Sequence, residues 1–61
     1  MIRIYDTYVS LNNIKKIYYG AIGDNKYMYI EYQFDEVPVK LEVGSYDDYI
    51  MYADEIAEAV K

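Results

Sequence analysis

Residues 27–43, YMYIEYQFDEVPVKLEV, decide the fold because they contain two alternating apolar patterns on either side of a short acidic break. Every second residue is apolar in both Tyr27–Phe34 and Val37–Val43, and Asp35 and Glu36 separate the two segments. A period of two is typical of β-strands that bury one face. We therefore predict that the two segments form an antiparallel β-hairpin with a short connection.

The alternation also assigns the two faces of this hairpin. The predicted core face comprises Met28, Ile30, Tyr32 and Phe34 from the first strand and Val37, Val39, Leu41 and Val43 from the second. Tyr27 and Tyr29 project from the opposite face, where Tyr18 of the preceding strand is expected to join them. Pro38 has no amide hydrogen to donate, so the second strand is expected at a sheet edge, where it offers a pairing surface.

The residues before the hairpin also have the composition of strands. Ile2–Leu11 is rich in Ile, Tyr, Thr and Val and is predicted as one strand; two short strands within 2–8, or an arm exchanged between copies, are the alternatives. Asn12-Asn13 favours a turn, because asparagine tolerates left-handed backbone angles. Ile14–Tyr19 is predicted as the next strand, and the turn residues of 20–26 favour a second hairpin.

The residues after Gly44 have the period of a helix. Ser45 is a suitable N-cap, and we predict a helix from Tyr46 to about Val60, with Lys61 closing its negative end. The predicted apolar stripe comprises Tyr46, Tyr49, Ile50, Ala53, Ile56, Ala57 and Val60. The predicted fold class is α+β: residues 1–61 form a single domain, a four-stranded antiparallel β-meander with one C-terminal helix packed on one face.

The composition excludes several classes of function. The 61 residues include neither cysteine nor histidine, which removes disulfides, thiolate zinc sites and the usual nucleophile and general-base systems. Eleven acidic and six basic residues give a net charge of −5, which repels the phosphates of nucleic acids. No segment has the length and hydrophobicity of a membrane span. We expect a cytoplasmic protein without a cofactor that binds neither nucleic acid nor membrane directly.

The predicted helix has an acidic face, formed by Asp47, Asp48, Asp54, Glu55 and Glu58. Such carboxylates can imitate the phosphates of DNA and occupy the basic groove of a nucleic-acid-handling protein. A solvated outer face is the simpler interpretation, because amphipathic helices usually have charged outer faces. The carboxylate spacing of a calcium loop is missing, so we predict no metal site.

The tyrosines form the second candidate surface. One helix cannot cover both faces of a sheet, so Tyr18, Tyr27 and Tyr29 are expected to face solvent or another chain. Tyrosine is enriched at protein interfaces, although strands also favour aromatic residues without any binding role. A chain of this size buries little surface on its own. We therefore predict a homodimer that associates through these tyrosines or through the edge at Pro38.

Two segments carry a resemblance to known proteins. Residues Tyr8–Ile14 (YVSLNNI) and Ser45–Asp48 (SYDD), with the tyrosine-rich strands between them, resemble the small acidic proteins of bacteriophages and mobile elements. Some of those proteins inhibit host defence, among them anti-CRISPR and anti-restriction proteins. The resemblance implies a non-catalytic protein that acts by binding another protein, often as a small oligomer, and it transfers no functional residue.

Together these observations predict a small acidic module that inhibits or regulates a basic nucleic-acid-binding protein of its host. The alternative is a structural protein that assembles with copies of itself through its tyrosines and sheet edge. An enzyme is disfavoured, because paired carboxylates need a cleft that so short a chain can hardly form alone, and we predict no catalytic residue.

Overall fold

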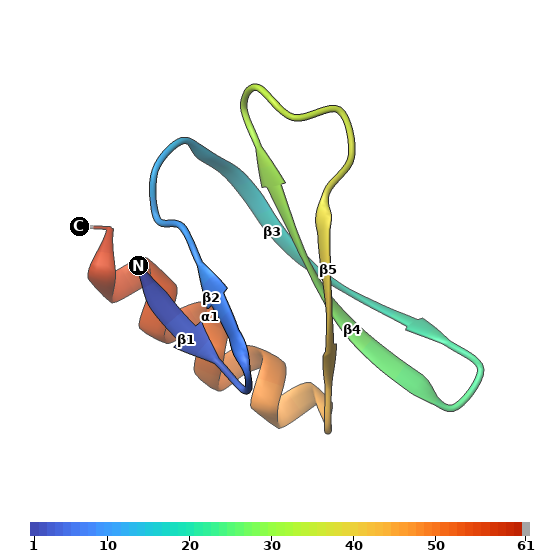
Figure 1. Cartoon of the computed structure of the whole chain (residues 1–61). Coiled ribbons are helices and arrows are strands. Elements are labelled where there is room, and N and C mark those ends of the chain that lie inside the picture. Colours follow the sequence, from blue (N-terminus) through green and yellow to red (C-terminus); the bar gives the residue numbers. More distant parts are fainter. Residues whose placement is uncertain (61) are drawn as a thin grey trace.

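The computed structural model describes residues 1–60, and these form five strands and one helix (Figure 1). The elements are β1 (Ile2–Ile4), β2 (Thr7–Val9), β3 (Ile14–Ile22), β4 (Asn25–Tyr32), β5 (Val39–Val43) and α1 (Tyr46–Ala59). β1 and β2 form a two-stranded antiparallel sheet, and β3, β4 and β5 form a three-stranded antiparallel sheet in that order. The α+β class is confirmed, but the single four-stranded meander is wrong.

The error lies in Ile2–Leu11, which is not one strand. The chain reverses at Tyr5 and Asp6, because Ile4 pairs with Thr7 across a two-residue loop. Tyr5 has a φ of 54°, a left-handed value that normally favours glycine at this position of a tight hairpin. Of the alternatives, the two short strands are what the structure shows.

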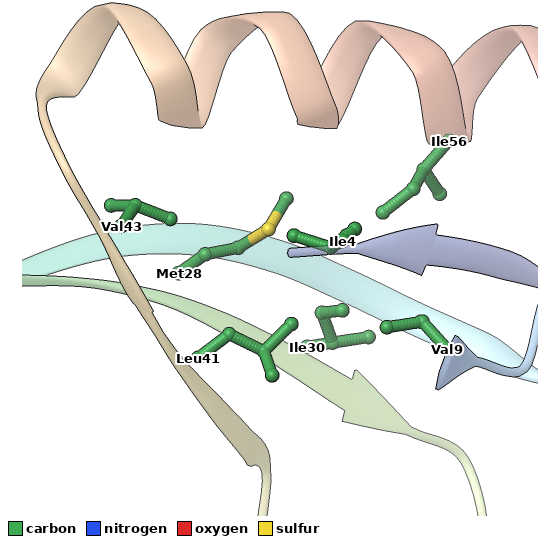
Figure 2. Packing of buried hydrophobic residues seen from close by; sticks show 7 residues of the cluster. All are labelled: Ile4, Val9, Met28, Ile30, Leu41, Val43 and Ile56. Atoms are coloured by element: carbon green, nitrogen blue, oxygen red, sulfur yellow. The ribbon is translucent and has the colours of Figure 1, made fainter. Parts of the chain in front are cut away.

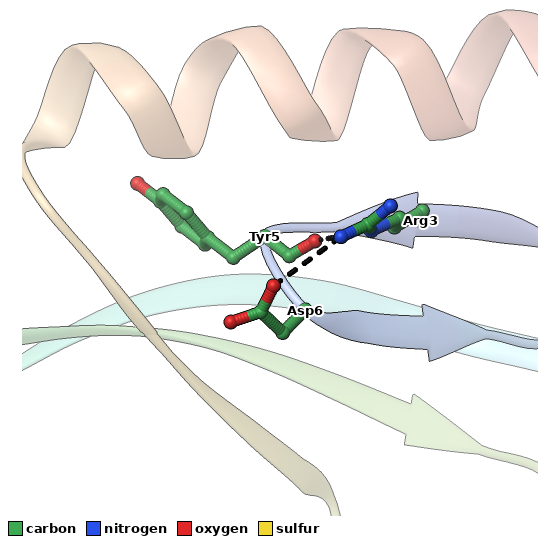
Figure 3. Close-up of polar contacts among 3 residues, drawn as sticks. All are labelled: Arg3, Tyr5 and Asp6. Carbon is green, nitrogen blue, oxygen red and sulfur yellow. Dashed lines mark hydrogen bonds and ion pairs between the residues drawn. The ribbon is translucent and has the colours of Figure 1, made fainter.

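The side chain of Arg3 supports this turn (Figure 3). Its Nε donates a 2.8 Å hydrogen bond to the carbonyl oxygen of Tyr5, and its Nη2 lies 3.3 Å from the Asp6 carboxylate. The guanidinium thus satisfies a carbonyl that the strand ladder leaves unpaired at the turn. Asp6 is the one turn-favouring residue of this loop, and no glycine, proline or asparagine accompanies it, so the composition did not predict the turn.

The two connections between the strands of the three-stranded sheet differ in length. β3 and β4 meet at the two-residue loop Gly23-Asp24, where Gly23 has a φ of 61°. β3 therefore extends three residues beyond the predicted end at Tyr19. By contrast, residues 33–38 form a loop instead of the predicted short hairpin connection, so Val37–Val43 is a strand only from Val39.

Contacts at the end of β4 explain why the strand stops at Tyr32. The Tyr32 hydroxyl donates to the carbonyl oxygen of Ser10 at 2.8 Å, and the amide of Gln33 donates to the carbonyl oxygen of Asn13 at 2.8 Å. The chain is therefore held to the β2–β3 connection and leaves the β5 ladder. Phe34 and Val37 were predicted in the core, but they are 81% and 75% exposed.

A β-bulge fits β3 to the core. Ile14 pairs with Tyr32, and Lys16 pairs with Glu31, so Lys15 is the extra residue on its strand. The bulge lets Ile14 and Ile17 both pack on the core although they are three residues apart. Without it, alternation would turn Ile14 to the opposite face.

Helix α1 begins as predicted and has a different buried stripe. The Ser45 hydroxyl accepts a 3.1 Å hydrogen bond from the amide of Asp48, which confirms the N-cap.

Ile56 is buried, but the predicted stripe members Ile50 and Ala57 are exposed and Tyr52 packs on the core in their place. The ring of Tyr52 lies 5.3 Å from that of Tyr5, so the β1–β2 hairpin determines which side of the helix is covered. Other predicted stripe residues divide: Tyr49 and Ala53 pack on the core, whereas Tyr46 and Val60 are about half exposed.

Val60 caps the C-terminal end of α1, and the predicted role of Lys61 lies outside the described residues. The core lies between one face of the three-stranded sheet and the hairpin and helix that cover it (Figure 2). It comprises Ile4, Val9, Met28, Ile30, Leu41, Val43 and Ile56.

We predict that Ile4→Val destabilises the protein by about 0.5–1.5 kcal/mol, because Ile4 is fully buried and the lost methyl group leaves a small void. Ile22→Val is the matched control, since that side chain is 56% exposed, and it should change the free energy of unfolding by much less. Urea unfolding measures both variants. Equal destabilisation would contradict the placement of β1 in the core.

Candidate functional site

The charge of the chain is concentrated on one element. Helix α1 contains five of the eleven acidic residues and no basic residue. The other six acidic residues are balanced by the six basic residues of the sequence. The formal net charge of −5 therefore equals the charge of α1 alone, and the rest of the chain is neutral overall.

Four of the five predicted acidic residues lie on the exposed part of α1. We call Asp47, Asp54, Glu55 and Glu58 the acidic face. The last three of these also line a shallow surface depression of 720 Å³, together with Ile2, Met51 and Ala59. Met51 is 47% exposed, so the acidic face borders an apolar patch where α1 meets β1.

The fifth acidic residue of α1, Asp48, makes contacts within the fold. Its carboxylate accepts a 3.0 Å hydrogen bond from the Tyr5 hydroxyl, and its amide donates to Ser45. The same Tyr5 hydroxyl accepts a 3.0 Å hydrogen bond from the amide of Gly44. Asp48 therefore joins the hairpin turn to the start of α1 and is less available to another molecule than its neighbours.

These contacts shift the pKa of Tyr5 in opposite directions. The Gly44 amide favours the ionised phenol and lowers the pKa, whereas partial burial and the hydrogen bond to the Asp48 carboxylate raise it. The raising effects are larger together, so the pKa of Tyr5 lies above its usual 10.0.

The outer face of the three-stranded sheet brings together the three predicted tyrosines. Tyr18 pairs with Tyr29 across β3 and β4, and their rings stack at 5.0 Å with an interplanar angle of 12°. The ring of Tyr27 lies 6.3 Å from that of Tyr29. We call Tyr18, Tyr27 and Tyr29 the tyrosine face.

Neighbouring residues of the same chain complete this surface. The ammonium of Lys16 lies 5.0 Å from the centre of the Tyr18 ring, and that of Lys40 lies 4.3 Å from the centre of the Tyr27 ring. A Cβ atom on Gly20 would lie 2.7 Å from the Tyr29 ring, so glycine is needed for the ring to lie across β3. The rings are thus half-buried by contacts within the chain.

The environment of Tyr18 shows the same partial covering. Desolvation raises the pKa of its hydroxyl, and the carboxylate of Glu31 raises it further through its charge and a hydrogen bond. Glu31 also lies 4.0 Å from the ammonium of Lys16.

The strand order places β5 at an edge of its sheet, as the proline predicted. Pro38 directly precedes this strand and is not part of it. The residues of this edge, Val39–Val43, and those of the acidic face belong to different elements.

Sequence reasoning did not predict a hollow at the end of β4. A cavity of 390 Å³ lies between the β2–β3 connection and the loop after β4, and its lining includes Tyr8, Tyr32, Phe34 and Val39. The alternating pattern extended through Phe34 and so predicted that this side chain is buried. The acidic pair after Phe34 predicts a strand end at Phe34, and no turn residue marks the actual end at Tyr32.

Two further findings limit the chemistry of the described part. Within residues 1–60, no three side chains of the Asp, Glu, His or Cys types gather closely enough to hold a metal ion. α1, the helix of this part of the chain, is too short and too polar to cross a membrane. No protein-family model, curated protein or solved structure matches the chain.

We predict that Tyr5→Phe lowers the free energy of unfolding by about 1–2 kcal/mol, because the Gly44 amide loses its acceptor and the Asp48 carboxylate loses a donor. Tyr8→Phe removes a hydroxyl from a ring that is 66% exposed and should change stability by less than about 0.5 kcal/mol. Thermal or urea unfolding compares the two variants. An equal effect would show that the Tyr5 hydroxyl does not fasten the hairpin to α1.

Stability should also fall in alkali. The pKa values of Tyr5, Tyr18 and Tyr32 are raised above 10.0, for Tyr32 through burial and then the charge of Asp35. The folded state holds these protons more tightly than the unfolded chain, and this difference contributes to the free energy of unfolding. The contribution is complete below about pH 10 and is lost as the pH rises through the folded pKa values. Urea unfolding across this range should show a smaller decline for Tyr32→Phe than for the wild type. An unchanged decline would refute the role of Tyr32.

Proposed function

We propose that the protein is a small non-catalytic binding module whose α1 docks on a basic surface of another protein. The observation that supports this most is the confinement of the net charge to one helix, four of whose five acidic residues are exposed. A solvated helix face usually mixes acidic and basic residues, which form pairs along the helix. Helix α1 has acidic residues alone, and the depression beside Met51 adds apolar surface for contact.

The partner that fits this face best is a nucleic-acid-handling protein of the host. Helices rise about 1.5 Å per residue, so Asp47, Asp54 and Glu58 span about 16 Å along α1. A strand of DNA places about five phosphates over that distance. A groove of lysine and arginine that binds phosphates would therefore accept this row, and the module would inhibit or regulate the partner by competing with nucleic acid.

The resemblance to small acidic phage and mobile-element proteins agrees with this proposal. The protein would act in the cytoplasm of the host cell, as an inhibitor of the anti-CRISPR or anti-restriction kind. Self-assembly is the second candidate function, and one observation favours it, the unpaired edge of β5. The tyrosine face favours it less, since its rings already contact lysines and one another.

Two variants of equal charge test the acidic face. The first is Asp47→Asn/Asp54→Asn/Glu55→Gln on α1, and the second is Asp24→Asn/Asp35→Asn/Glu36→Gln in the exposed turns of the sheet. Each removes three negative charges, but only the first alters the acidic face.

We expect wild-type protein to capture a basic nucleic-acid-binding protein from a bacterial lysate, and nucleic acid or high salt to release it. With the purified partner, the first variant should bind roughly tenfold more weakly and the second nearly as well as the wild type. Calorimetric titration measures these affinities. If both variants bind like the wild type, α1 is a solvated face; if both weaken equally, only net charge matters.

A further inference from the structure

The outer edge of β5 is open along its whole length. β5 is hydrogen-bonded to β4 on one side, and the strand order of the described chain ends there. Such an edge presents unpaired amide and carbonyl groups to another strand.

The charged residues of this edge are complementary when two copies of the strand pair antiparallel. The residues of the edge are Val39, Lys40, Leu41, Glu42 and Val43. A two-fold axis at Leu41 places Lys40 opposite Glu42 of a second copy, and Glu42 opposite Lys40 of that copy. Residues directly opposite in an antiparallel pair interact, and opposite charges there are stabilising. Both side chains are exposed, so both can form these contacts.

We propose that β5 pairs antiparallel with β5 of a second copy in this register, which joins two three-stranded sheets into one six-stranded sheet. The core-side residues also match, because Val39 then lies opposite Val43 of the second copy, and Leu41 opposite its counterpart. The proposal does not depend on the function proposed for α1.

The residues on either side of β5 limit the pairing to these five positions. In the same register Pro38 lies opposite Gly44 of the second copy. Proline has no amide hydrogen, and the amide of Gly44 already donates to the Tyr5 hydroxyl at 3.0 Å. The ladder therefore ends at both sides, and the two-fold pairing closes without leaving β5 free for a third copy.

A lysine on an edge strand usually prevents pairing, but in this register Lys40 lies opposite Glu42 of the second copy and not opposite another lysine. In the single chain its ammonium lies 4.3 Å from the centre of the Tyr27 ring, and on pairing it turns to the Glu42 carboxylate. The opposite edge, β3, is less suitable, because its bulge at Lys15 interrupts a regular ladder. β1 and β2 have only three residues each.

The dimer would also bury additional surface, which so short a chain lacks on its own. Phe34 and Val37 are exposed in the loop that leads into β5, at the end of the same edge. They can add apolar area beside Gly44 and Ser45 of the second copy. The two-fold axis is perpendicular to the sheet, so both helices lie on one side of the dimer and both tyrosine faces lie on the other.

The test uses charge reversal at the two edge positions. Sedimentation equilibrium of the wild type, up to millimolar concentration, should show a mass of twice 7.2 kDa that does not grow further. Lys40→Glu and Glu42→Lys each place like charges opposite one another, and each should weaken the dimer about tenfold or more. A mixture of the two variants restores opposite charges in both contacts and should dimerise like the wild type, as should the double variant Lys40→Glu/Glu42→Lys.

Lys15→Glu and Asp24→Lys are the matched controls, because they make the same charge changes at exposed positions away from β5 and should leave the mass unchanged. Circular dichroism verifies folding of every variant. A monomeric wild type, a dimer that tolerates both single reversals, or a mixture that stays monomeric would each overturn the proposal. If a single variant does not fold, hydrogen exchange of the wild-type β5 amides decides, since it should slow as concentration rises, and concentration-independent exchange would refute the pairing.

Discussion

The position of the helix depends on the hydroxyl group of Tyr5. This one oxygen accepts from the Gly44 amide and donates to the Asp48 carboxylate, so it fastens the β1–β2 turn to the junction of β5 and α1. Tyr5 keeps a left-handed backbone conformation at a cost of roughly 1–3 kcal/mol, which the surrounding contacts must offset. They include the Arg3 hydrogen bond to the turn, the ring contact with Tyr52 and the burial of the adjacent Ile4.

The β1–β2 hairpin covers only one face of the three-stranded sheet, so the two faces of this sheet have different roles. Ile4 and Val9 lie between the three-stranded sheet and the helix, so the inner face of this sheet packs on the core (Figure 2). The outer face is covered by its own tyrosines and lysines. Among the surfaces open to other molecules are the acidic face of α1 and the edge of β5, which belong to different elements.

Much of the fold was predictable, and the errors have physical reasons. The alternating apolar pattern identified Met28 and Ile30 as the residues of β4 that lie in the core. The turn residues near Gly23 identified the hairpin of β3 and β4. The tyrosine face followed from the same alternation. The turn at Tyr5 was missed because it is stabilised by Arg3 and by contacts with residues some forty positions away, which local composition does not reveal. The division of the acidic residues was missed for a similar reason, since only the fold shows that Asp48 binds Tyr5.

The separation of charge makes the molecule an electric dipole. One end is a helix with five carboxylates, and the remainder has no net charge. In the field of any basic surface, a freely tumbling molecule of this kind turns its helix toward the surface before the two touch. Encounters then begin in the productive orientation, so the rate of association rises at low ionic strength even where the contacts of the final complex are few.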